Sequence, residues 1–371
     1  MKILHITSWY PTRKNPKSAL WVERHIEALA SAGDENKVYH LELNKGRFEL
    51  SLGKTELRGN KKYCLISSFA PWFAMELVAI LFLSWILWKE RKQQYDIINF
   101  HIAYPNLTYW HWIKRWIKTP VVITEHWSAY HDNFGLASAD QLPRIQRIFR
   151  QKIPVIAVSQ ALLNDIKTFS YSNFPSFVVP NVVDTQVFHY QNEVQPQAHR
   201  FFMVSQWKYP KDPFSVIRNF AAYSQVHPEA ELRIGGYGPQ IEKMKKLIIS
   251  LSLQEHTQLL GSLNSDEIAL EMNQASALVH LSNYETFSVV CAEAICCGCP
   301  VIASDIGGIP EFINESNGYL IKDKDQLLNS MKLINHTYFN RELISNTLQL
   351  DKSSIGERYS KILKLLSNNH K

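Results

Sequence analysis

Cysteine is scarce in this chain of 371 residues, and its five cysteines are unevenly placed. Four of them lie between residues 291 and 299, and the fifth is Cys64. An odd and clustered set argues against a framework of disulfides, so we expect a protein of the reducing cytoplasm. We expect no zinc at these cysteines either, because no nearby histidine completes a ligand set.

Long uncharged apolar runs are also missing. The best candidate for a membrane span, residues 69–88, contains Glu76, which leaves only the twelve uncharged residues 77–88. A spanning helix needs about 20 apolar residues. We therefore predict a helix over 69–88 that is buried in the domain or lies on a membrane surface, where the basic residues that follow it would meet anionic headgroups.

Acidic residues are few in the first half of the chain. Residues 1–190 hold 23 Lys and Arg against 15 Asp and Glu, whereas residues 191–371 hold 17 against 19. Nine of the ten Trp also precede residue 130. The first half is therefore expected to contact an anionic partner. Nucleic acid is not expected, because no run of five like charges and no basic-aromatic module is found.

Short apolar runs alternate with helical patterns along the chain, which is typical of parallel α/β folding. The first half carries predicted strands at 2–7, 38–43, 97–100, 121–124, 155–159 and 177–180. The pattern then restarts with predicted strands at 201–204, 231–235, 278–281, 301–304 and 319–321. Two successive arrays indicate two doubly wound domains, with the polar stretch 184–200 as their linker. Ligands of such folds bind beyond the carboxyl ends of the strands.

The C-terminal tail carries Ile355, Tyr359, Ile362 and Leu366 at helical spacing. This apolar stripe must pack against one of the two domains. We predict a first domain over 1–183, joined by the C-terminal helix 354–371, and a second domain over 184–353.

The segment 283–310, NYETFSVVCAEAICCGCPVIASDIGGIP, combines two glutamates with a predicted helix. Ser288 is placed to cap this helix, whose free backbone N–H groups suit a diphosphate. Glu293 lies inside the helix between two alanines, where an idle carboxylate would be costly. Glu285 precedes the cap. Each glutamate alone would be an ordinary surface residue, but together they bracket an anion site, as a nucleotide-diphosphate-sugar requires.

The two glutamates form an E-x7-E pattern, written E-x-F-S-x-V-x-x-E-A, followed by C-G-C-P-V-I-A-S-D-x-G-G-I-P-E. This segment resembles the retaining glycosyltransferases of family 4, and the resemblance extends in order over nearly the whole chain. It implies the α/β architecture called GT-B, with two Rossmann-like, doubly wound domains facing across a cleft. It also implies that Glu285 binds hydroxyls of the donor sugar and that Glu293 binds the nucleotide ribose. The resemblance further implies that the backbone contacts the sugar and the phosphates at Thr286, Phe287, Ser288 and Val289.

The stretch 204–211 resembles the family's loop G-R-L-x-x-x-K-G, whose Arg and Lys neutralise the diphosphate. Lys211 matches the Lys of this loop. Gln206 stands at the Arg position without a charge, and Lys208 is a candidate substitute. In the same resemblance, Gly236 belongs to the G-x-G-P turn at the rim of the nucleotide pocket, and Leu263 belongs to the segment that flanks the base.

In the first domain, residues 15–20 match the family's loop after the first strand. Ser18 and Ala19 are the implied contacts to the phosphates, and Ala19 replaces a residue that is normally Gly. His126 follows the predicted strand 121–124 and matches the family's histidine beside the donor sugar and the reacting centre. His101, after the strand 97–100, is a second candidate on the acceptor side.

Two competing motifs point elsewhere. Asp323-Lys324-Asp325 is a D-x-D sequence, which holds a divalent metal in another glycosyltransferase architecture, but here it is predicted to begin a helix by N-capping. Ser159 lacks the G-x-S-x-G setting of a hydrolase nucleophile. We therefore expect neither a metal cofactor nor a hydrolase triad.

The resemblance and the residues together predict a retaining hexosyltransferase. It would move a sugar from a UDP- or GDP-sugar, bound by the second domain, to a glycan or lipid-linked acceptor bound by the first. The expected pathway is the assembly of bacterial capsule, exopolysaccharide or lipopolysaccharide. Lys211 and the helix dipole at Ser288 would supply the positive field that a metal supplies elsewhere.

The expected location is the cytoplasm, with a peripheral contact to the anionic inner face of the plasma membrane. Two alternatives to the transferase stay open. The first is a sugar-nucleotide epimerase of the same fold. The second is a non-catalytic partner subunit that binds a nucleotide sugar, which Gln206 and Ala19 favour.

Overall fold

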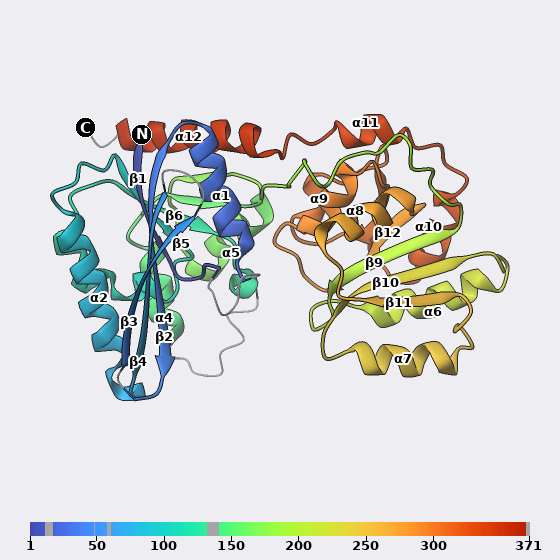
Figure 1. The fold of residues 1–371 in the computed structure, drawn as a ribbon, viewed down its shortest axis with the longest axis horizontal. Helices are drawn as coiled ribbons and strands as arrows, with labels where there is room; N and C mark the ends of the chain where they lie inside the picture. Colours follow the sequence, from blue (N-terminus) through green and yellow to red (C-terminus); the bar gives the residue numbers. More distant parts are fainter. Residues whose placement is uncertain (12–17, 48, 58–60, 132–140, 369–371) are drawn as a thin grey trace. The chain divides into compact units, whose positions relative to one another are not determined.

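The computed structural model describes residues 1–11, 18–47, 49–57, 61–131 and 141–368, which divide into two units (Figure 1). The N-terminal unit is Met1–Val182 together with Lys352–Lys371, and the C-terminal unit is Val183–Asp351. The boundaries predicted from the sequence lie within two residues of these.

The N-terminal unit is built on an eight-stranded sheet with the strand order β3-β4-β2-β1-β5-β6-β7-β8. Neighbouring strands are parallel except for β3 and β4, which form an antiparallel pair. The strands are β1 (Lys2–Thr7), β2 (Glu35–Lys45), β3 (Glu49–Leu57), β4 (Lys61–Ala70), β5 (Ile97–His101), β6 (Val121–Glu125), β7 (Val155–Ala157) and β8 (Ser176–Val178). The α-helices are α1 (Leu20–Ser31), α2 (Met75–Glu90), α3 (Trp110–Ile113), α4 (Gln141–Phe149), α5 (Gln160–Ser170) and α12 (Lys352–Asn368). Short 3-10 turns are η1 (Trp72–Ala74), η2 (Asn106–Tyr109), η3 (Lys114–Trp116) and η4 (Ser128–Tyr130).

The C-terminal unit is built on a six-stranded parallel sheet with the order β11-β10-β9-β12-β13-β14. The strands are β9 (Arg200–Gln206), β10 (Glu231–Tyr237), β11 (Thr257–Gly261), β12 (Ala277–His280), β13 (Val301–Ser304) and β14 (Gly318–Ile321). The helices are α6 (Pro213–Ser224), α7 (Ile241–Ser250), α8 (Ser265–Gln274), α9 (Val289–Cys296), α10 (Gln326–Ile334) and α11 (Arg341–Ser345), with the 3-10 turn η6 (Ile309–Glu311).

The core of the C-terminal unit lies between this sheet and helices α6, α7 and α10. Fully buried apolar side chains of the strands, such as Phe201 and Ile302, meet Phe220 of α6 and Met244 of α7. Helices of a doubly wound fold connect parallel strands, so the strands run in one direction and their carboxyl ends meet at one edge. The loops after β9, β10, β12 and β13 therefore emerge at that edge of the sheet.

The predicted helix over 69–88 is wrong at its beginning. Residues 69 and 70 end strand β4, the turn η1 follows, and α2 begins at Met75. Pro71 separates the two elements, because its fixed φ and missing N–H do not suit the interior of either. Among the described residues, no helix combines the length and the apolar character needed to cross a bilayer.

Three strands were absent from the sequence prediction. The antiparallel pair β3 and β4 leads from β2 to α2 without an intervening helix, and β11 forms an edge of the second sheet. β3 and β11 are edge strands, open on one side, and their polar residues interrupt the continuous apolar run of a buried parallel strand. β4 lies between β3 and β2, and its sequence KKYCLISSFA breaks the apolar run with two lysines and two serines. The C-terminal helix was predicted correctly as a helix, and α12 returns to pack beside α1 (Figure 1).

Candidate functional site

Three charged or titratable side chains meet at the carboxyl edge of the second sheet. Lys211 follows β9, His280 ends β12, and Glu285 lies in the loop between β12 and α9. The Lys211 ammonium donates a hydrogen bond to Glu285 Oε1. His280 Nε2 donates to the same oxygen at 2.7 Å, and it lies 3.4 Å from Lys211 Nζ. The structure thus brings two predicted residues together and adds His280 to them.

The environment of this cluster keeps Glu285 ionised. Burial alone would raise the pKa of the carboxyl, but the charge of Lys211 and the hydrogen bond from His280 outweigh it and lower the pKa to about 2. Burial and the neighbouring ammonium lower the pKa of His280, so its imidazole is neutral at pH 7. Both hydrogen bonds reach Oε1, and Oε2 accepts none from the described residues. One carboxylate oxygen therefore remains able to accept hydrogen bonds from a ligand.

Backbone hydrogen bonds fix the two loops that carry Lys211 and Glu285. The Asp212 amide donates to Leu281 O at 3.0 Å, and the Asn283 amide donates to Pro210 O at 2.9 Å. On the other side, the Gly308 amide donates to Glu285 O at 3.2 Å. These bonds hold Lys211 and Glu285 in place by their backbones as well as by their side chains.

Gly307 is required for this arrangement. Its φ of 53° lies in the left-handed region, and a Cβ built on it would lie 1.7 Å from Glu285 O. Only glycine tolerates both the conformation and the close approach of the two backbones. The Gly-Gly of the segment 283–310 thus supports the loop of Glu285.

Ser288 stands at the start of α9, but it does not cap the helix as predicted. Its backbone is left-handed (φ 67°, ψ 79°), and its side chain makes no capping hydrogen bond. An N-cap side chain reaches the backbone from an extended conformation, which this φ excludes. The hydroxyl donates instead to Cys291 Sγ at 3.2 Å, and burial raises the pKa of that thiol to about 12. The first backbone N–H groups of α9 therefore receive no bond from the Ser288 side chain.

The other residues of this motif occupy distinct positions. Phe287 is buried and packs on Phe312, with ring centroids 5.0 Å apart. Glu293 is partly exposed on α9, although both flanking alanines are fully buried. Thr286 and Val289 are likewise partly exposed. The carboxylate of Glu293 thus lies at the border of the core, and Phe287 anchors the loop that precedes α9.

Trp207, and not Gln206, holds the loop after β9. The indole of Trp207 is buried and donates from Nε1 to Gly235 O at 2.9 Å, while its amide donates to Tyr237 O at 2.7 Å. Gln206, at the end of β9, is exposed. Lys208 is exposed as well. These bonds join the loop of Lys211 to the glycine turn after β10.

Gly236 and Leu263 both belong to this edge of the sheet. A Cβ on Gly236 would lie 1.9 Å from Ser205 O, so the turn approaches the end of β9 closely. Leu263 is partly exposed and covers Gly235, where an added Cβ would lie 2.8 Å from Leu263 Cδ1. Gly236 thus adjoins the end of β9, and Leu263 packs against β10.

In the N-terminal unit, His126 follows β6 and is almost completely buried. Its Nδ1 lies 3.2 Å from Asn181 Oδ1, and Nε2 has no hydrogen-bond partner among the described residues. Because an amide oxygen only accepts, Nδ1 carries the proton and Nε2 keeps its lone pair. Burial and the neighbouring His25 lower the pKa of His126 well below its usual value, so the ring is neutral. A buried acceptor without a partner is rare in a folded protein.

His126 belongs to a group of buried histidines. Its ring lies 5.0 Å from the ring of His25 on α1 and 6.2 Å from that of His101 on β5. His101 Nε2 in turn lies 3.0 Å from Nδ1 of His5 on β1. Burial lowers the pKa of His25 to about 4 and that of His101 well below its usual value. The rings of His25, His101 and His126 can pack together because burial keeps these three imidazoles uncharged.

Glu125, next to His126, is a buried carboxylate that joins two loops. Its Oε1 accepts from the Ala103 amide at 2.6 Å and from the Tyr130 hydroxyl at 2.6 Å. Burial raises the pKa of Glu125 to about 7 against the effect of these hydrogen bonds. Glu125 thus fixes the backbone at the end of β6, from which His126 projects.

The predicted phosphate loop of the first domain is described only in part. Residues 15–17 lie outside the described residues. Ser18 is partly exposed, and Ala19 is buried at the start of α1 with a left-handed φ of 49°. Left-handed backbone is the conformation that glycine adopts without strain, which agrees with the Gly that the family resemblance expects at this position.

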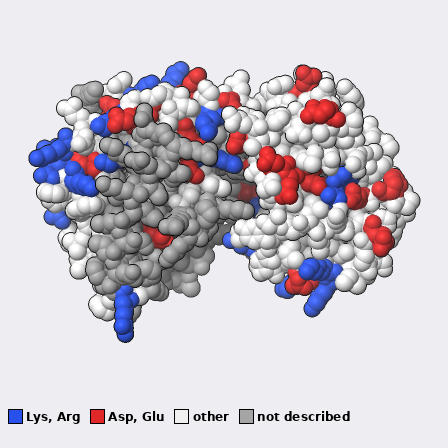
Figure 2. Space-filling view, viewed as in Figure 1, with Lys and Arg blue, Asp and Glu red and all other residues white. Residues whose placement is uncertain are grey.

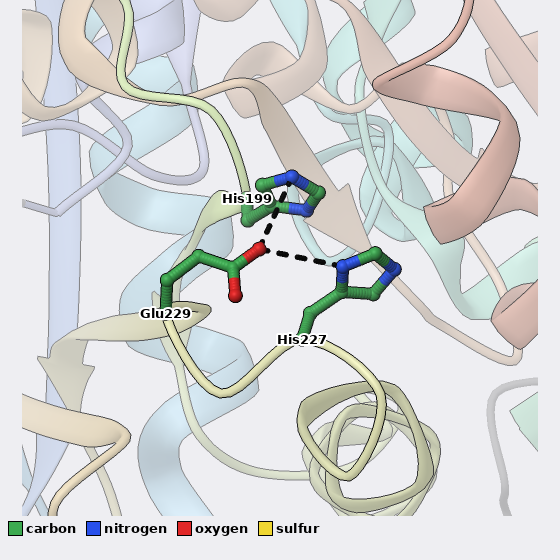
Figure 3. A group of neighbouring side chains, drawn as sticks. All are labelled: His199, His227 and Glu229. Atoms are coloured by element: carbon green, nitrogen blue, oxygen red, sulfur yellow. Dashed lines mark ion pairs between the residues drawn. The ribbon is translucent and has the colours of Figure 1, made fainter.

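Among the described residues, one group of side chains has the composition of a metal site (Figure 3). Its residues precede β9 and β10, whereas Lys211 follows β9. Glu229 Oε1 lies 3.4 Å from His199 Nε2 and 3.4 Å from His227 Nδ1. The rings of His199 and His227 are stacked 4.4 Å apart, and His227 also stacks on Tyr223. Lone pairs of imidazole lie in the ring plane, so stacked rings direct them side by side rather than at one ion. The Glu229 carboxylate therefore contacts two imidazoles of an aromatic stack, which explains why these three side chains lie together.

The remaining motifs do not form a second metal site among the described residues. The four cysteines at 291, 296, 297 and 299 are buried free thiols. The D-x-D aspartates precede α10, but Asp325 makes no side-chain cap, and Asp323 Oδ1 accepts from the Asp325 amide at 3.2 Å. The N-capping predicted for this motif is therefore wrong in detail, because the aspartates close a turn before the helix.

His280 is the site residue that the sequence prediction missed. It stands in an otherwise apolar predicted strand, ALVHL, directly before the loop that leads to Glu285. A polar residue at the carboxyl end of a buried strand was the available signal, since this end of the sheet is where ligands bind. Asn181 was missed for a different reason, because it lies 55 residues from its partner His126.

Comparison with known proteins identifies the family of the chain. The sequence profile described as "Glycosyl transferases group 1" matches residues 184–346, and the profile "Glycosyltransferase Family 4" matches residues 19–187. N-acetyl-alpha-D-glucosaminyl L-malate synthase of Bacillus anthracis is 26% identical over 247 residues, which are 63% of each chain. Poly(glycerol-phosphate) alpha-glucosyltransferase of Bacillus subtilis is 27% identical over 184 residues, 48% of this chain and 27% of that protein. Each match spans less than two thirds of the relative's length.

Solved structures show the same fold over the whole chain. Sucrose-phosphate synthase of Thermosynechococcus elongatus aligns with a TM-score of 0.76 at 17% identity and covers 100% of both chains. The HepE protein of Anabaena in complex with UDP aligns with a TM-score of 0.72 at 17% identity, over 98% of this chain and 100% of that one. The lipopolysaccharide outer core galactosyltransferase WaaB also aligns with a TM-score of 0.72, at 16% identity, over 98% of this chain and 100% of that one.

The fold is therefore that of the GT-B proteins, with two α/β units of the Rossmann type. The two profiles match successive halves of the chain and together reach from residue 19 to residue 346. The chain belongs to the group 1, family 4 glycosyltransferases.

Proposed function

We propose that this protein transfers a sugar from a nucleotide-diphosphate-sugar to a glycan or lipid-linked acceptor, with retention at the anomeric carbon. In the reaction, the bond between the anomeric carbon and a diphosphate oxygen breaks. The acceptor hydroxyl forms the new bond to that carbon and releases its proton, and nucleoside diphosphate leaves. Retention is inferred from the family resemblance of the segment 283–310. The relatives named as a glucosaminyl L-malate synthase and as an alpha-glucosyltransferase support the class of reaction.

The observation that carries the proposal is the pairing of Lys211 with Glu285. Glu285 holds the ammonium through Oε1 and keeps Oε2 able to accept from sugar hydroxyls. With a pKa of about 2, the carboxylate is ionised at every physiological pH. A fixed cation beside a fixed acceptor suits a ligand in which a polyhydroxylated ring is joined to a charged diphosphate.

The leaving diphosphate needs positive charge, and this edge of the sheet offers two sources. Lys211 is one, and the amino end of α9 is the other, since its backbone N–H groups are not capped by Ser288. Gln206 brings no charge at the position of the usual Arg, and exposed Lys208 is free to swing toward a bound phosphate. We infer that these groups replace a metal, so that no metal cofactor is needed.

The remaining contacts follow the same proposal. Glu293, partly exposed on α9, would bind the ribose, and Gly236, Leu263 and the backbone of 286–289 would line the nucleotide. Ser18 and Ala19 would approach the phosphates. His126 offers a neutral ring whose Nε2 can accept a hydrogen bond from a sugar hydroxyl. The structural neighbour solved with UDP supports a nucleotide donor with uracil as the base, and guanine is the other base that we propose.

We further propose that the acceptor belongs to bacterial cell-surface polysaccharide assembly, which the likeness to the lipopolysaccharide galactosyltransferase supports. Four buried free thiols suit a reducing compartment, and we therefore place the reaction in the cytoplasm. The basic and Trp-rich N-terminal half would meet the anionic inner face of the plasma membrane.

A thermal-shift screen against UDP-, GDP- and ADP-sugars tests donor binding, because a ligand that binds the folded state alone raises the melting temperature. One nucleotide class should shift the wild type, and Lys211→Met and Glu293→Ala should lose that shift. Glu315→Ala is the matched control, since Glu315 is exposed on the same unit and away from the motif. If no nucleotide sugar stabilises the wild type, the proposed donor site is wrong.

Turnover separates the transferase from its two rivals. A transferase releases nucleoside diphosphate slowly alone and faster when a glycan or lipid-linked acceptor is added. An epimerase would convert the donor sugar without an acceptor, and a non-catalytic subunit would bind the donor and release nothing. Transferred radiolabelled sugar in the acceptor fraction therefore decides among the three.

A further inference from the structure

Helix α2 is apolar on two opposite faces, although only one of them is buried. Val78, Leu83, Ile86 and Leu87 are buried against the N-terminal unit. On the other face, Leu77 and Leu81 are each 60% exposed, and Trp85 and Trp88 are 36% and 47% exposed. A helix that is apolar all round is normally buried on all sides. The exposed face of α2 thus lacks the polar residues that water would require.

The four exposed residues lie close together on the helix surface. Their spacing of four, four and three residues places Leu77, Leu81, Trp85 and Trp88 on one side of the helix. Exposed apolar side chains are common singly, but a contiguous row marks a contact surface. Two further exposed tryptophans, Trp112 and Trp116, lie on α3 and η3, which pack against α2.

Positive charge accompanies these tryptophans. Lys89 Nζ lies 4.7 Å from the centre of the Trp85 ring, and the Arg91 guanidinium lies 4.1 Å from that of Trp88. Arg115 stands in the same relation to Trp112, at 6.0 Å. In Figure 2, Lys and Arg side chains gather at the left edge of the N-terminal unit, the side on which Figure 1 places α2. Tryptophan with a basic partner is the pairing typical of the headgroup region of a membrane.

Acidic side chains near this surface are neutralised by partners. Glu76 is exposed at the start of α2, but it forms an ion pair of 2.8 Å with Arg144. Glu90, at the other end, is buried and accepts from Lys37 at 2.6 Å and from Tyr95 at 2.6 Å. The exposed Lys89, Arg91 and Lys92 therefore keep a net positive charge at this end of α2.

We propose that the exposed face of α2, formed by Leu77, Leu81, Trp85 and Trp88, docks the protein on an anionic phospholipid surface, with Lys89, Arg91 and Lys92 at the headgroups. With 16 residues, α2 is about 24 Å long, shorter than the roughly 30 Å of a hydrocarbon core, so it lies in the interface plane. A second copy would offer the exposed Lys89, Arg91 and Lys92 no matching row of acidic side chains from this face, whereas an anionic surface neutralises them. The proposal rests on the proposed function in one respect, since a lipid-linked acceptor would be met at this surface.

Liposome flotation tests the surface with the full chain and with vesicles of phosphatidylcholine alone or mixed with phosphatidylglycerol. The wild type should float with the anionic vesicles. The triple variant Lys89→Gln, Arg91→Gln, Lys92→Gln should bind them about 100-fold more weakly, since each basic residue near an anionic surface is worth about fivefold. Leu77→Gln with Leu81→Gln should lose binding too, while Leu343→Gln, exposed on the other unit, should bind as the wild type does.

Three outcomes overturn the proposal. The wild type does not float with anionic vesicles, or it floats and the α2 variants float equally well. In the third, light scattering shows a dimer that Leu77→Gln with Leu81→Gln dissociates, in which case the face joins two copies of the chain. The donor-induced thermal shift is measured on every variant and should be unchanged, because α2 belongs to the unit that lacks Lys211 and Glu285. A failure of the docking surface is thereby distinguished from a failure of the donor site.

Discussion

The hydroxyl of Tyr359 on α12 lies 2.6 Å from the side-chain amide of Asn99 on β5, although 260 residues separate them in the chain. The same hydroxyl lies 2.5 Å from Thr124 Oγ1 on β6. The Tyr359 ring also packs edge-on against His25, whose ring lies 5.0 Å from that of His126 at an angle of 46°. The returning helix therefore completes the polar interior of the N-terminal unit beneath His126.

Tyr359→Phe should destabilise the N-terminal unit by about 1 kcal/mol, because it removes the hydroxyl that bonds both Asn99 and Thr124 and leaves these buried residues with fewer hydrogen bonds. The urea midpoint of unfolding measures this loss. Tyr338→Phe is the control, since Tyr338 is 88% exposed and should leave the midpoint unchanged. Equal stability of the two variants would show that the Tyr359 hydroxyl is not needed.

Lys211→Met should cost about 3 kcal/mol of stability, because it leaves the buried Glu285 carboxylate without its cation. The double variant Lys211→Met, Glu285→Gln should recover part of the loss, since no unpaired charge remains. Urea unfolding of the wild type and the three variants forms a double-mutant cycle that measures the coupling. A coupling near zero would contradict the ion pair.

The low pKa of Glu285 predicts a stability that falls in acid. Its pKa is about 2 in the folded protein against an ordinary value of 4.5, so its contribution is complete above pH 4.5 and disappears as the pH falls toward 2. Unfolding of the wild type and of Glu285→Gln at pH 3 and pH 7 measures this contribution. The difference between the two proteins should be smaller at pH 3, and a constant difference would refute the assignment.

The raised pKa of Glu125 predicts that the free energy of unfolding falls as the pH rises toward neutral. Burial raises its pKa to about 7, so the folded protein keeps a proton that the unfolded chain releases above pH 4.5. The free energy of unfolding should therefore fall by roughly 1 kcal/mol for each pH unit between pH 5 and pH 7. In Glu125→Gln this slope should be absent. If the free energy of unfolding of Glu125→Gln kept the same dependence on pH, the titrating group would be another residue.

Gly307→Ala should be more harmful than Gly261→Ala, although both glycines have a positive φ. A methyl group on Gly261 meets no atom within 4 Å, whereas one on Gly307 would lie 1.7 Å from Glu285 O. We expect Gly307→Ala to cost about 2 kcal/mol more, as overpacking does, and to lose the donor-induced thermal shift. Equal melting temperatures and equal shifts for the two variants would be inconsistent with the packed loop.

Much of the fold could be predicted because its central strands are locally distinctive. β1 was predicted with the bounds that the structure shows, and β5, β6, β9 and β10 were placed within two residues, since fully buried parallel strands read as apolar runs. β3 escaped prediction because it is an edge strand that alternates polar and apolar residues, and β4 escaped because lysines and serines break its apolar run. Ser288 was misjudged as a side-chain cap because its φ is set by the close loop around it rather than by its own preference.

The sequence by itself determined the family and most of the order of the elements, and it made Lys211, Glu285, Glu293 and His126 the candidate site residues, because motif residues and strand ends can be located from local pattern. Only the tertiary structure decided what surrounds them. It placed His280 on the same carboxylate oxygen as Lys211 and left His126 Nε2 without a partner. It also exposed one apolar face of α2 while burying the other. Such relationships join residues far apart in the chain, and burial and charge depend on these neighbours rather than on local sequence.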